Sequence, residues 1–170
     1  VKPIKKKDFQ IKIPKGKSKI KVINVIPKQL ITKLSIEKIH EENGYATADT
    51  QNDILKIAVI ERHKASGNIG LGFVKGFGLK TGAIASTIAH DSHNMIVIGT
   101  NDDDMYYAAN QLVKSQGGKI IVENGKTLAQ LKLPIAGLMS EEPAEIVMEK
   151  LQTLEKTASD IGCKINDPFM

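Results

Sequence analysis

A chain of 170 residues, 41% of them hydrophobic, is long enough for one domain with a buried core. No apolar run approaches the ~18 residues of a membrane helix, and no apolar stretch follows the charged N-terminus. We therefore expect no membrane span and no secretory signal in this sequence. The single cysteine, Cys163, excludes an internal disulfide and metal sites built from several cysteines. One cysteine fits a reducing compartment, so we expect a cytoplasmic protein.

The net charge of +5 is unevenly distributed. Residues 1–38 carry twelve lysines and two acidic residues, a balance of +10, whereas the remainder has a balance of −5. The lysines alternate with apolar residues, as in Lys19 to Val22, which is typical of the solvent face of a strand. The sequence has no tryptophan on which bases could stack and only one arginine for bidentate hydrogen bonds to phosphate. We expect no nucleic-acid partner and no membrane partner.

The first half of the chain is predicted to be mostly strands, because apolar and polar residues alternate with a period of two. Residues 67–82 hold six of the fourteen glycines and are predicted to form an ordered but irregular loop. Asn43-Gly44 indicates a tight turn. The predicted extended segments are 9–13, 19–26, a stretch around Leu34, Ile36 and Ile39, and a buried strand at 54–60.

The second half mixes strands and helices. Asn101 is the predicted N-cap of a helix that stops near Gly117, and Ser140 that of a second helix that stops at Gly162. A central strand is expected at residues 95–98, and a hairpin at 120–131 around Asn124-Gly125. We predict an α+β fold, with a mixed or mostly antiparallel sheet and at least two helices packed on it. Residues 1–170 are predicted to form a single domain whose first 50 residues are rich in strands and lysines.

Several catalytic patterns are absent from the sequence. The glycines at 70 and 72 lack the third glycine of a dinucleotide-binding fingerprint, and neither Gly-Lys-Ser nor Gly-Lys-Thr has the upstream glycine of a P-loop. One cysteine excludes the zinc site of cytidine-type deaminases. No histidine-x-histidine pair and no nucleophile elbow occur.

Two polar clusters remain. His90, Asp91, His93 and Asn94 lie between two apolar runs, and Glu61-Arg62-His63 follows the buried strand. Histidines three residues apart can converge to move protons or hold a polar substrate, although turn hydrogen bonds at Asp91 and Asn94 explain the pattern equally well. An ion pair at a strand end likewise explains Glu61-Arg62-His63. Because both clusters flank the glycine-rich segment, together they indicate a site.

The sequence resembles the C-terminal domain of microbial adenine deaminases, in the amidohydrolase superfamily. The resemblance lies in ERHKASGNIGLGFVKGFGLKTGAIASTIAHDSHN (61–94), GTNDDDM (99–105), PIAGLMSEEPAE (134–145) and the closing GCKINDPFM. It covers residues 50–170, and the earlier part more loosely.

The resemblance implies a metal-dependent hydrolase that converts adenine to hypoxanthine and ammonia, in purine salvage or adenine catabolism. Its divalent metal, manganese or iron, and its catalytic base belong to an N-terminal barrel that this sequence lacks. We therefore expect a piece of a longer polypeptide that is inactive in isolation, with no metal of its own. Its partners are the barrel and a small purine, and homo-oligomerisation stays open.

We hypothesise that the glycine-rich segment and the two polar clusters face the open end of that barrel and close or support the purine site. His90, Asp91 and His93 are the catalytic candidates. The substrate-binding or site-closing candidates are Glu61, Arg62, His63, Lys75 and Asn94. An alternative function is a stand-alone interaction module or subunit that docks an acidic partner through its lysine-rich half, and a third is a small metal-binding enzyme built on His90, Asp91 and His93.

Overall fold

The computed structural model describes residues 1–29 and 31–169 of the chain. The first half contributes η1 (Lys6–Phe9), a 3-10 helix, and the strands β1 (Ile11–Lys12), β2 (Lys19–Val25), β3 (Thr32–Lys38), β4 (His40–Glu42), β5 (Tyr45–Thr47), β6 (Ile54–Ile60) and β7 (Ile69–Lys75). The second half contributes β8 (Ala83–Ser86), β9 (Met95–Gly99), α1 (Asp102–Lys114), β10 (Gly118–Glu123), β11 (Lys126–Lys132) and α2 (Ala144–Asp160).

Most of the strands form one large sheet with the order β11-β10-β8-β9-β6-β7-β2-β3. Neighbours in it are antiparallel except β2 and β7, which run parallel. The strands β1, β5 and β4 form a separate antiparallel sheet. The fold is therefore α+β with a mixed, mostly antiparallel sheet, as the sequence predicts. The central pair β9 and β6 confirms the buried strands expected at residues 95–98 and 54–60.

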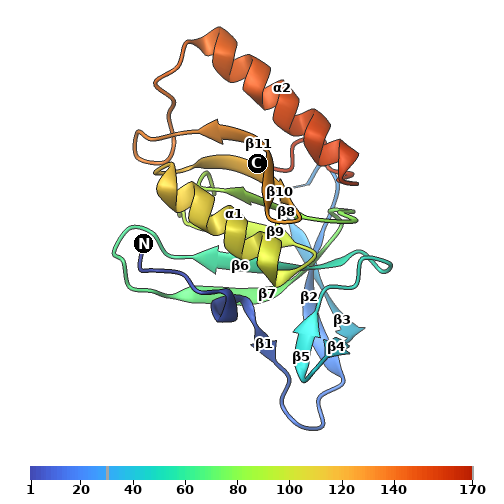
Figure 1. The fold of residues 1–170 in the computed structure, drawn as a ribbon. Coiled ribbons are helices and arrows are strands. Elements are labelled where there is room, and N and C mark those ends of the chain that lie inside the picture. Colours follow the sequence, from blue (N-terminus) through green and yellow to red (C-terminus); the bar gives the residue numbers. More distant parts are fainter. Residues whose placement is uncertain (30, 170) are drawn as a thin grey trace.

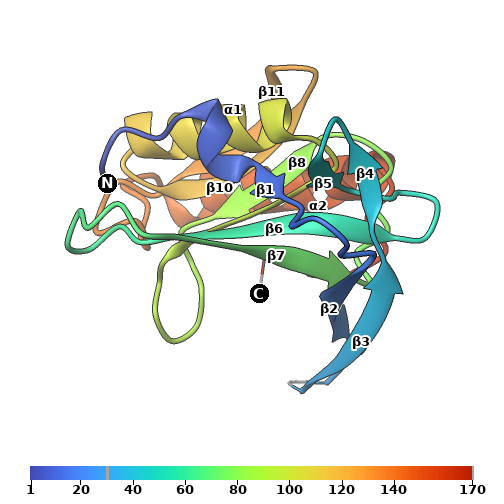
Figure 2. The same cartoon turned by 90° about the horizontal axis from the view of Figure 1, so that it is seen from below.

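The two α-helices cover different parts of the large sheet (Figure 1). On one face α1 packs against β8, β9 and β10, and its residues Met105 and Leu112 are fully buried there. On the other face α2 packs against β11 and β10 through Leu154 and Ala158. Figure 2 shows η1 and α1 above the sheet, and the β8–β9 loop and the C-terminus below it. Within the described residues, neither helix has the length and apolar composition that a membrane crossing requires.

Local sequence signals set the start of α1 and the tight turns. The Oδ1 atom of Asn101 accepts a hydrogen bond from the Asp104 amide (2.8 Å), which confirms Asn101 as the N-cap. The predicted turns at 43–44 and 124–125 have positive φ at both residues, as two-residue hairpin loops require. The buried Asp104 carboxylate also accepts a hydrogen bond from the Gly125 amide (2.7 Å), which ties α1 to the β10–β11 hairpin.

The prediction of an irregular loop over residues 67–82 is wrong for its first half, which is β7. There Ile69, Leu71 and Phe73 alternate with glycines, and such alternation with a period of two predicts a strand. The prediction gave more weight to the number of glycines than to this alternation. The two glycines of β7, Gly70 and Gly72, do not have positive φ, whereas Gly67 before the strand and Gly76, Gly78 and Gly82 after it do. The backbone is irregular between β7 and β8, so the prediction holds for residues 76–82.

Two predicted element starts are also wrong. Phe9 ends the 3-10 helix η1 rather than opening a strand, and the strand that follows is only β1. Ser140 does not cap α2, because its hydroxyl accepts a hydrogen bond from the Glu142 amide (3.1 Å) in the preceding turn. The residue at the N-cap position is Pro143, which makes no side-chain cap. The predicted stop at Gly162 is confirmed, because Ile161 is the C-cap and Gly162 follows it with a φ of +98° and donates its amide to the Ser159 carbonyl (2.9 Å).

A buried ion pair joins η1, β6 and α1. Lys56, on β6, is 2% exposed, and its ammonium pairs with Asp102 at the start of α1. The same ammonium donates to the Phe9 carbonyl (2.6 Å) at the end of η1. Nearby, Lys6 pairs with Asp103 at 2.6 Å, but both of these side chains are exposed. Of the two lysines, only Lys56 connects the elements from inside the core.

We expect the Lys56→Ala substitution to lower the free energy of unfolding by roughly 3–5 kcal/mol, because it leaves the Asp102 carboxylate without its cation. Lys6→Ala is the matched control, and it should change stability little, since ion pairs between exposed side chains are weak. Urea denaturation of both variants measures the difference. Similar small losses in the two would contradict a stabilising role for the buried pair.

Candidate functional site

The two polar clusters meet at one end of the large sheet. Antiparallel pairing sets Ile60 of β6 opposite Met95 of β9, and Ser86 of β8 opposite Ile96. The segment after β6 and the loop between β8 and β9 therefore leave the sheet at the same end. Figure 2 shows these segments together at the left, where the loop between β8 and β9 descends on the side away from α1. The pairing of β6 with β9, and of β9 with β8, thus brings residues 61–63 and 87–94 together.

Arg62 is the residue that holds this end of the sheet together. Its Nε–H donates to the carbonyl of His93 (2.5 Å), and its Nη2 donates to the carbonyl of Ala136 (2.9 Å). The guanidinium therefore spans three segments: the end of β6, the β8–β9 loop and the loop after β11. Partial burial lowers the pKa of Arg62 from its usual value, although a guanidinium stays cationic in proteins. Both hydrogen-bond acceptors of the guanidinium are backbone carbonyls of loops, so Arg62 fixes the conformation of those loops.

Gly137 and Thr87 complete the packing around Arg62. The Thr87 hydroxyl, fully buried, donates to the Gly137 carbonyl (2.6 Å) and accepts from the Gly118 amide (2.8 Å). Gly137 has a φ of +74°, and a Cβ atom there would lie 2.6 Å from the Nη1 atom of Arg62. A side chain at this position would therefore displace the guanidinium.

Glu61 organises the loop that follows β6. Its carboxylate accepts hydrogen bonds from the amides of His63 (2.5 Å), Lys64 (2.6 Å) and Ser66 (2.8 Å), and from the Ser66 hydroxyl (2.8 Å). The backbone amides of Lys64 and Ser66 are the largest causes that lower the pKa of Glu61 to about 2. A carboxylate with this pKa is a weak base at neutral pH, so its position favours loop formation over proton transfer.

The histidines differ in how much the fold constrains them. The Nε2 atom of His63 lies 2.8 Å from the carbonyl of Ser92, so this nitrogen carries a proton and donates it to the carbonyl. The His93 amide donates to the Ala89 carbonyl (2.6 Å), which closes the β8–β9 loop. In contrast, His90 and Asp91 pair with each other while both side chains are 90% exposed. His90 and Asp91 are therefore the members of the cluster that stay available to another molecule.

The remaining candidates lie apart from this pair. The Asn94 amide donates to the Ser92 hydroxyl (3.3 Å) within the loop. Lys75 does not join the cluster, because it pairs with Ile54 at the opposite end of β6 and lies 3.7 Å from the carboxylate of Glu37. Among the described residues, no three histidine, cysteine or carboxylate side chains lie close enough together to hold a metal ion.

A model of the adenine deaminase C-terminal domain matches residues 29–170 of the chain. The chain belongs to this family. The match includes every segment of the candidate site, from the loop after β6 to the loop after β11.

Curated relatives extend the match to nearly the whole chain. An adenine deaminase of Dehalococcoides mccartyi is 49% identical over 169 residues, which is 99% of this chain and 29% of that protein. An adenine deaminase of Desulfatibacillum aliphaticivorans is 51% identical over 96% of this chain and 28% of its own length. Adenine deaminase 1 of Rhizobium etli is 45% identical over 99% of this chain and 29% of its own length. The chain therefore spans less than a third of the curated relatives it matches.

Sequence reasoning missed Thr87 and Gly137, which fix the loops of this adenine deaminase C-terminal domain. A signal for Gly137 was available, because it lies inside the segment PIAGLMSEEPAE, where a glycine after three small or apolar residues indicates a tight turn. Thr87 lies in a run of small residues, and nothing in that run distinguishes a buried hydroxyl from an exposed one. Only the contact with the Gly137 carbonyl reveals its role.

We expect Gly137→Ala to destabilise the domain by about 1–3 kcal/mol, because the new methyl group combines an unfavourable φ with a clash against Arg62. Gly125→Ala is the matched control: its φ is +68°, but no atom lies within 4 Å of the added Cβ. It should therefore cost only backbone strain. Thermal unfolding of both variants separates the clash from the strain, and equal losses would contradict the contact with Arg62.

The loop after β6 should open in acid. Since the folded pKa of Glu61 lies below its usual 4.5, the carboxylate stabilises the loop fully above that pH, and the stabilisation is lost as the pH falls toward about 2. The chemical shifts of the Lys64 and Ser66 amide protons report this transition in an NMR titration. Glu61→Gln removes the titrating group, so the same transition persisting in that variant would exclude Glu61 as its cause.

Proposed function

We propose that this chain is the C-terminal domain of an enzyme that hydrolyses adenine to hypoxanthine and ammonia. The observation that carries the proposal is the family match over residues 29–170, together with 45–51% identity to relatives named adenine deaminase. Hydrolytic deamination requires an activated water, a proton relay to the leaving amine and groups that hold the purine. The divalent metal, manganese or iron, that activates the water belongs to an amidohydrolase barrel elsewhere in the longer polypeptide.

In this proposal the end of the sheet held by Arg62 faces the barrel and helps to close the purine site. Two sets of hydrogen bonds support this role. Arg62 donates to backbone carbonyls and Glu61 accepts from backbone amides, so both side chains position the loops. His90 and Asp91 project from those loops with their polar atoms exposed. An exposed imidazole and carboxylate side by side can hold a purine nitrogen or move a proton.

We further propose that the enzyme acts in the cytoplasm, in the salvage or breakdown of adenine. The single buried cysteine supports this location, since an unpaired thiol fits a reducing compartment.

We expect His90→Ala and His93→Ala in the full-length enzyme to lower kcat/KM for adenine by roughly tenfold or more, because a positioned proton-transfer or binding group contributes about 10²-fold or more. His40→Ala is the matched control. His40 lies on β4, where it bonds to Thr47, and should leave turnover unchanged. Steady-state kinetics measure the effect, and circular dichroism checks that each variant is folded.

Normal kinetics in both the His90 and His93 variants would remove the site-closing role of this cluster while leaving the family membership intact. Absence of adenine hydrolysis by the metal-loaded, full-length wild-type protein would instead reject the proposed activity itself.

A further inference from the structure

One face of the large sheet is covered over only part of its width. Its β10–β11 side carries α2, but no helix of the described residues packs on the same face of β6, β7, β2 and β3. Figure 1 shows α2 at one side of the sheet, and Figure 2 shows no helix directly below β6 and β7, where the β8–β9 loop and the C-terminus lie. A sheet of this kind normally buries an apolar face against another layer.

The residues on the uncovered side are apolar and unusually exposed. Val59 of β6 is 36% exposed, Ile23 of β2 is 44% exposed and Leu34 of β3 is 65% exposed. Ile23 and Leu34 are direct partners in the ladder, so they share this face. Val59 is paired with Gly70, which adds no side chain to shield it. Ile23 and Leu34 are therefore adjacent exposed apolar residues, and Val59 lies on the same face two strands away from Ile23. Apolar side chains exposed on one face of a sheet mark an interaction surface.

A groove of about 260 Å³ runs along this face, next to the exposed residues. Its floor consists of apolar strand residues, and its sides are the C-terminal segment and the start of the β8–β9 loop. His90 lies at its rim, so the groove continues into the polar cluster at the end of the sheet. Residues that line the groove include Ile57, Ile96, Ile98, Ile88, His90 and Phe169.

We propose that the part of the longer polypeptide outside these 170 residues packs on this face and inserts an apolar ridge into the groove. The identity of this occupant rests on the proposed function. The curated relatives are more than three times as long as the matched region, so a large covering structure belongs to the same polypeptide. Because the groove runs into the rim at His90, the same contact brings the exposed His90–Asp91 pair against that structure.

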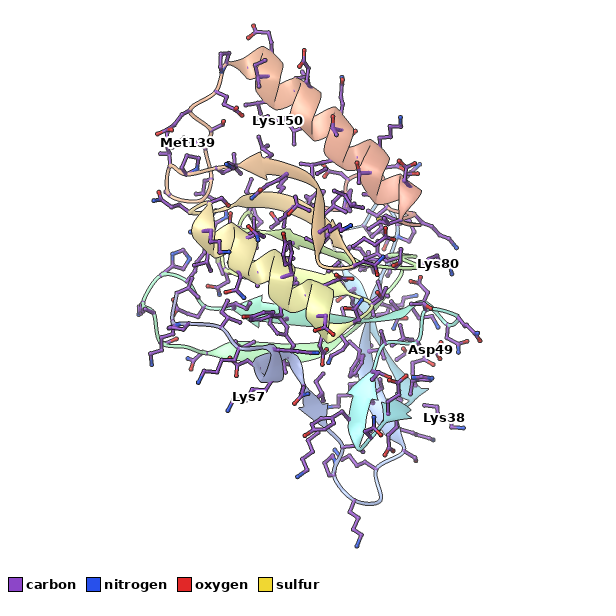
Figure 3. The ribbon with its side chains drawn as sticks, in the orientation of Figure 1. Lys7, Lys38, Asp49, Lys80, Met139 and Lys150 are labelled. Carbon is purple, nitrogen blue, oxygen red and sulfur yellow. The ribbon has the colours of Figure 1, made fainter. Side chains whose placement is uncertain are left out.

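Lysines at the edge of the uncovered face indicate the charge of the structure that packs there. Lys19 and Lys21 of β2 alternate with Ile20 and Val22, so they share the face of Ile23 and border it with positive charge. Figure 3 shows Lys38, the ladder partner of Lys19, at this far end of the molecule, away from Met139 and Lys150. The occupant therefore carries carboxylates beside its apolar ridge. A second copy of this face would bring the same lysines, so it fits the margin less well.

Cysteine accessibility in the full-length protein tests the proposal. Ile23→Cys and Val59→Cys are placed singly on the uncovered face, and Leu128→Cys on β11 is the matched control, since Leu128 and Ile23 are both 44% exposed in this domain. Each variant is treated with a maleimide under native conditions, and labelling is measured on the individual peptide by mass spectrometry. We expect labelling at positions 23 and 59 to be at least tenfold slower than at position 128. Equal rates at the three positions would overturn the proposal.

Gly70→Val provides a second measurement that does not depend on a polar substitution. A Cβ atom at Gly70 meets only the Val59 carbonyl oxygen at 3.9 Å, and valine favours strands, so this domain should accept the change. In the full-length protein the added side chain should separate the two surfaces and raise labelling of Ile23→Cys at least severalfold. Unchanged protection in this double variant would contradict contact at β7.

Two controls separate the outcomes. Protection that disappears on dilution to the monomer, as measured by light scattering, would assign the face to a second copy and overturn the proposal. Adenine hydrolysis is measured on the same wild-type preparation. Protection without hydrolysis would reject the proposed activity and keep the packing surface. Hydrolysis without protection would overturn the packing surface and keep the proposed activity.

Discussion

The guanidinium of Arg62 joins the three segments that emerge from one end of the large sheet. It donates to the carbonyls of His93 and Ala136, which belong to different loops. Because one guanidinium donates to both carbonyls, the positions of the two loops depend on the same side chain. Gly137 permits this arrangement, since any side chain there would occupy the space of the guanidinium. The conformation of the candidate site therefore follows from one interaction at a strand end.

This constraint divides the polar residues of the site into two groups. Glu61, Arg62 and His63 all bond to backbone atoms, so their chemistry is used to fix the loops. His90 and Asp91 bond to each other and remain exposed. A fixed set of loops that carries an exposed pair is the arrangement expected of a surface that contributes to a site completed by another part of the polypeptide. This division suits membership in a family whose proteins are several times longer than this chain.

The same reasoning connects the site to the uncovered sheet face. The glycines of β7 remove side chains from a face on which Val59 and Ile23 already stand exposed. A strand weakened by glycine is useful where another structure approaches closely. The groove beside it reaches His90, so the apolar surface and the polar cluster form one continuous region. A structure that packs on the apolar face can therefore also fix the position of the polar cluster, because both belong to the same sheet.

The sequence by itself determined the elements that depend on local patterns. The Asn101 cap, the turns at 43–44 and 124–125, the buried β6 and the α+β class follow from residue types at fixed spacings. The resemblance carried by residues 61–94 likewise identifies the family from the sequence alone. Local patterns failed where glycine composition masked the alternation of β7 and where Ser140 offered a cap that α2 does not use.

Tertiary structure alone decided which of the candidate residues meet. The register of β6 against β9 brings residues 61–63 to the β8–β9 loop, and the register of β6 against β7 carries Lys75 to the opposite end. Arg62 looks like half of an ion pair in the sequence, yet its known partners are carbonyls from distant loops. The physical reason is that periodicity reports only the environment along one segment. Strand order and register arise from pairing between segments far apart in the chain, and they fix the ends at which side chains gather.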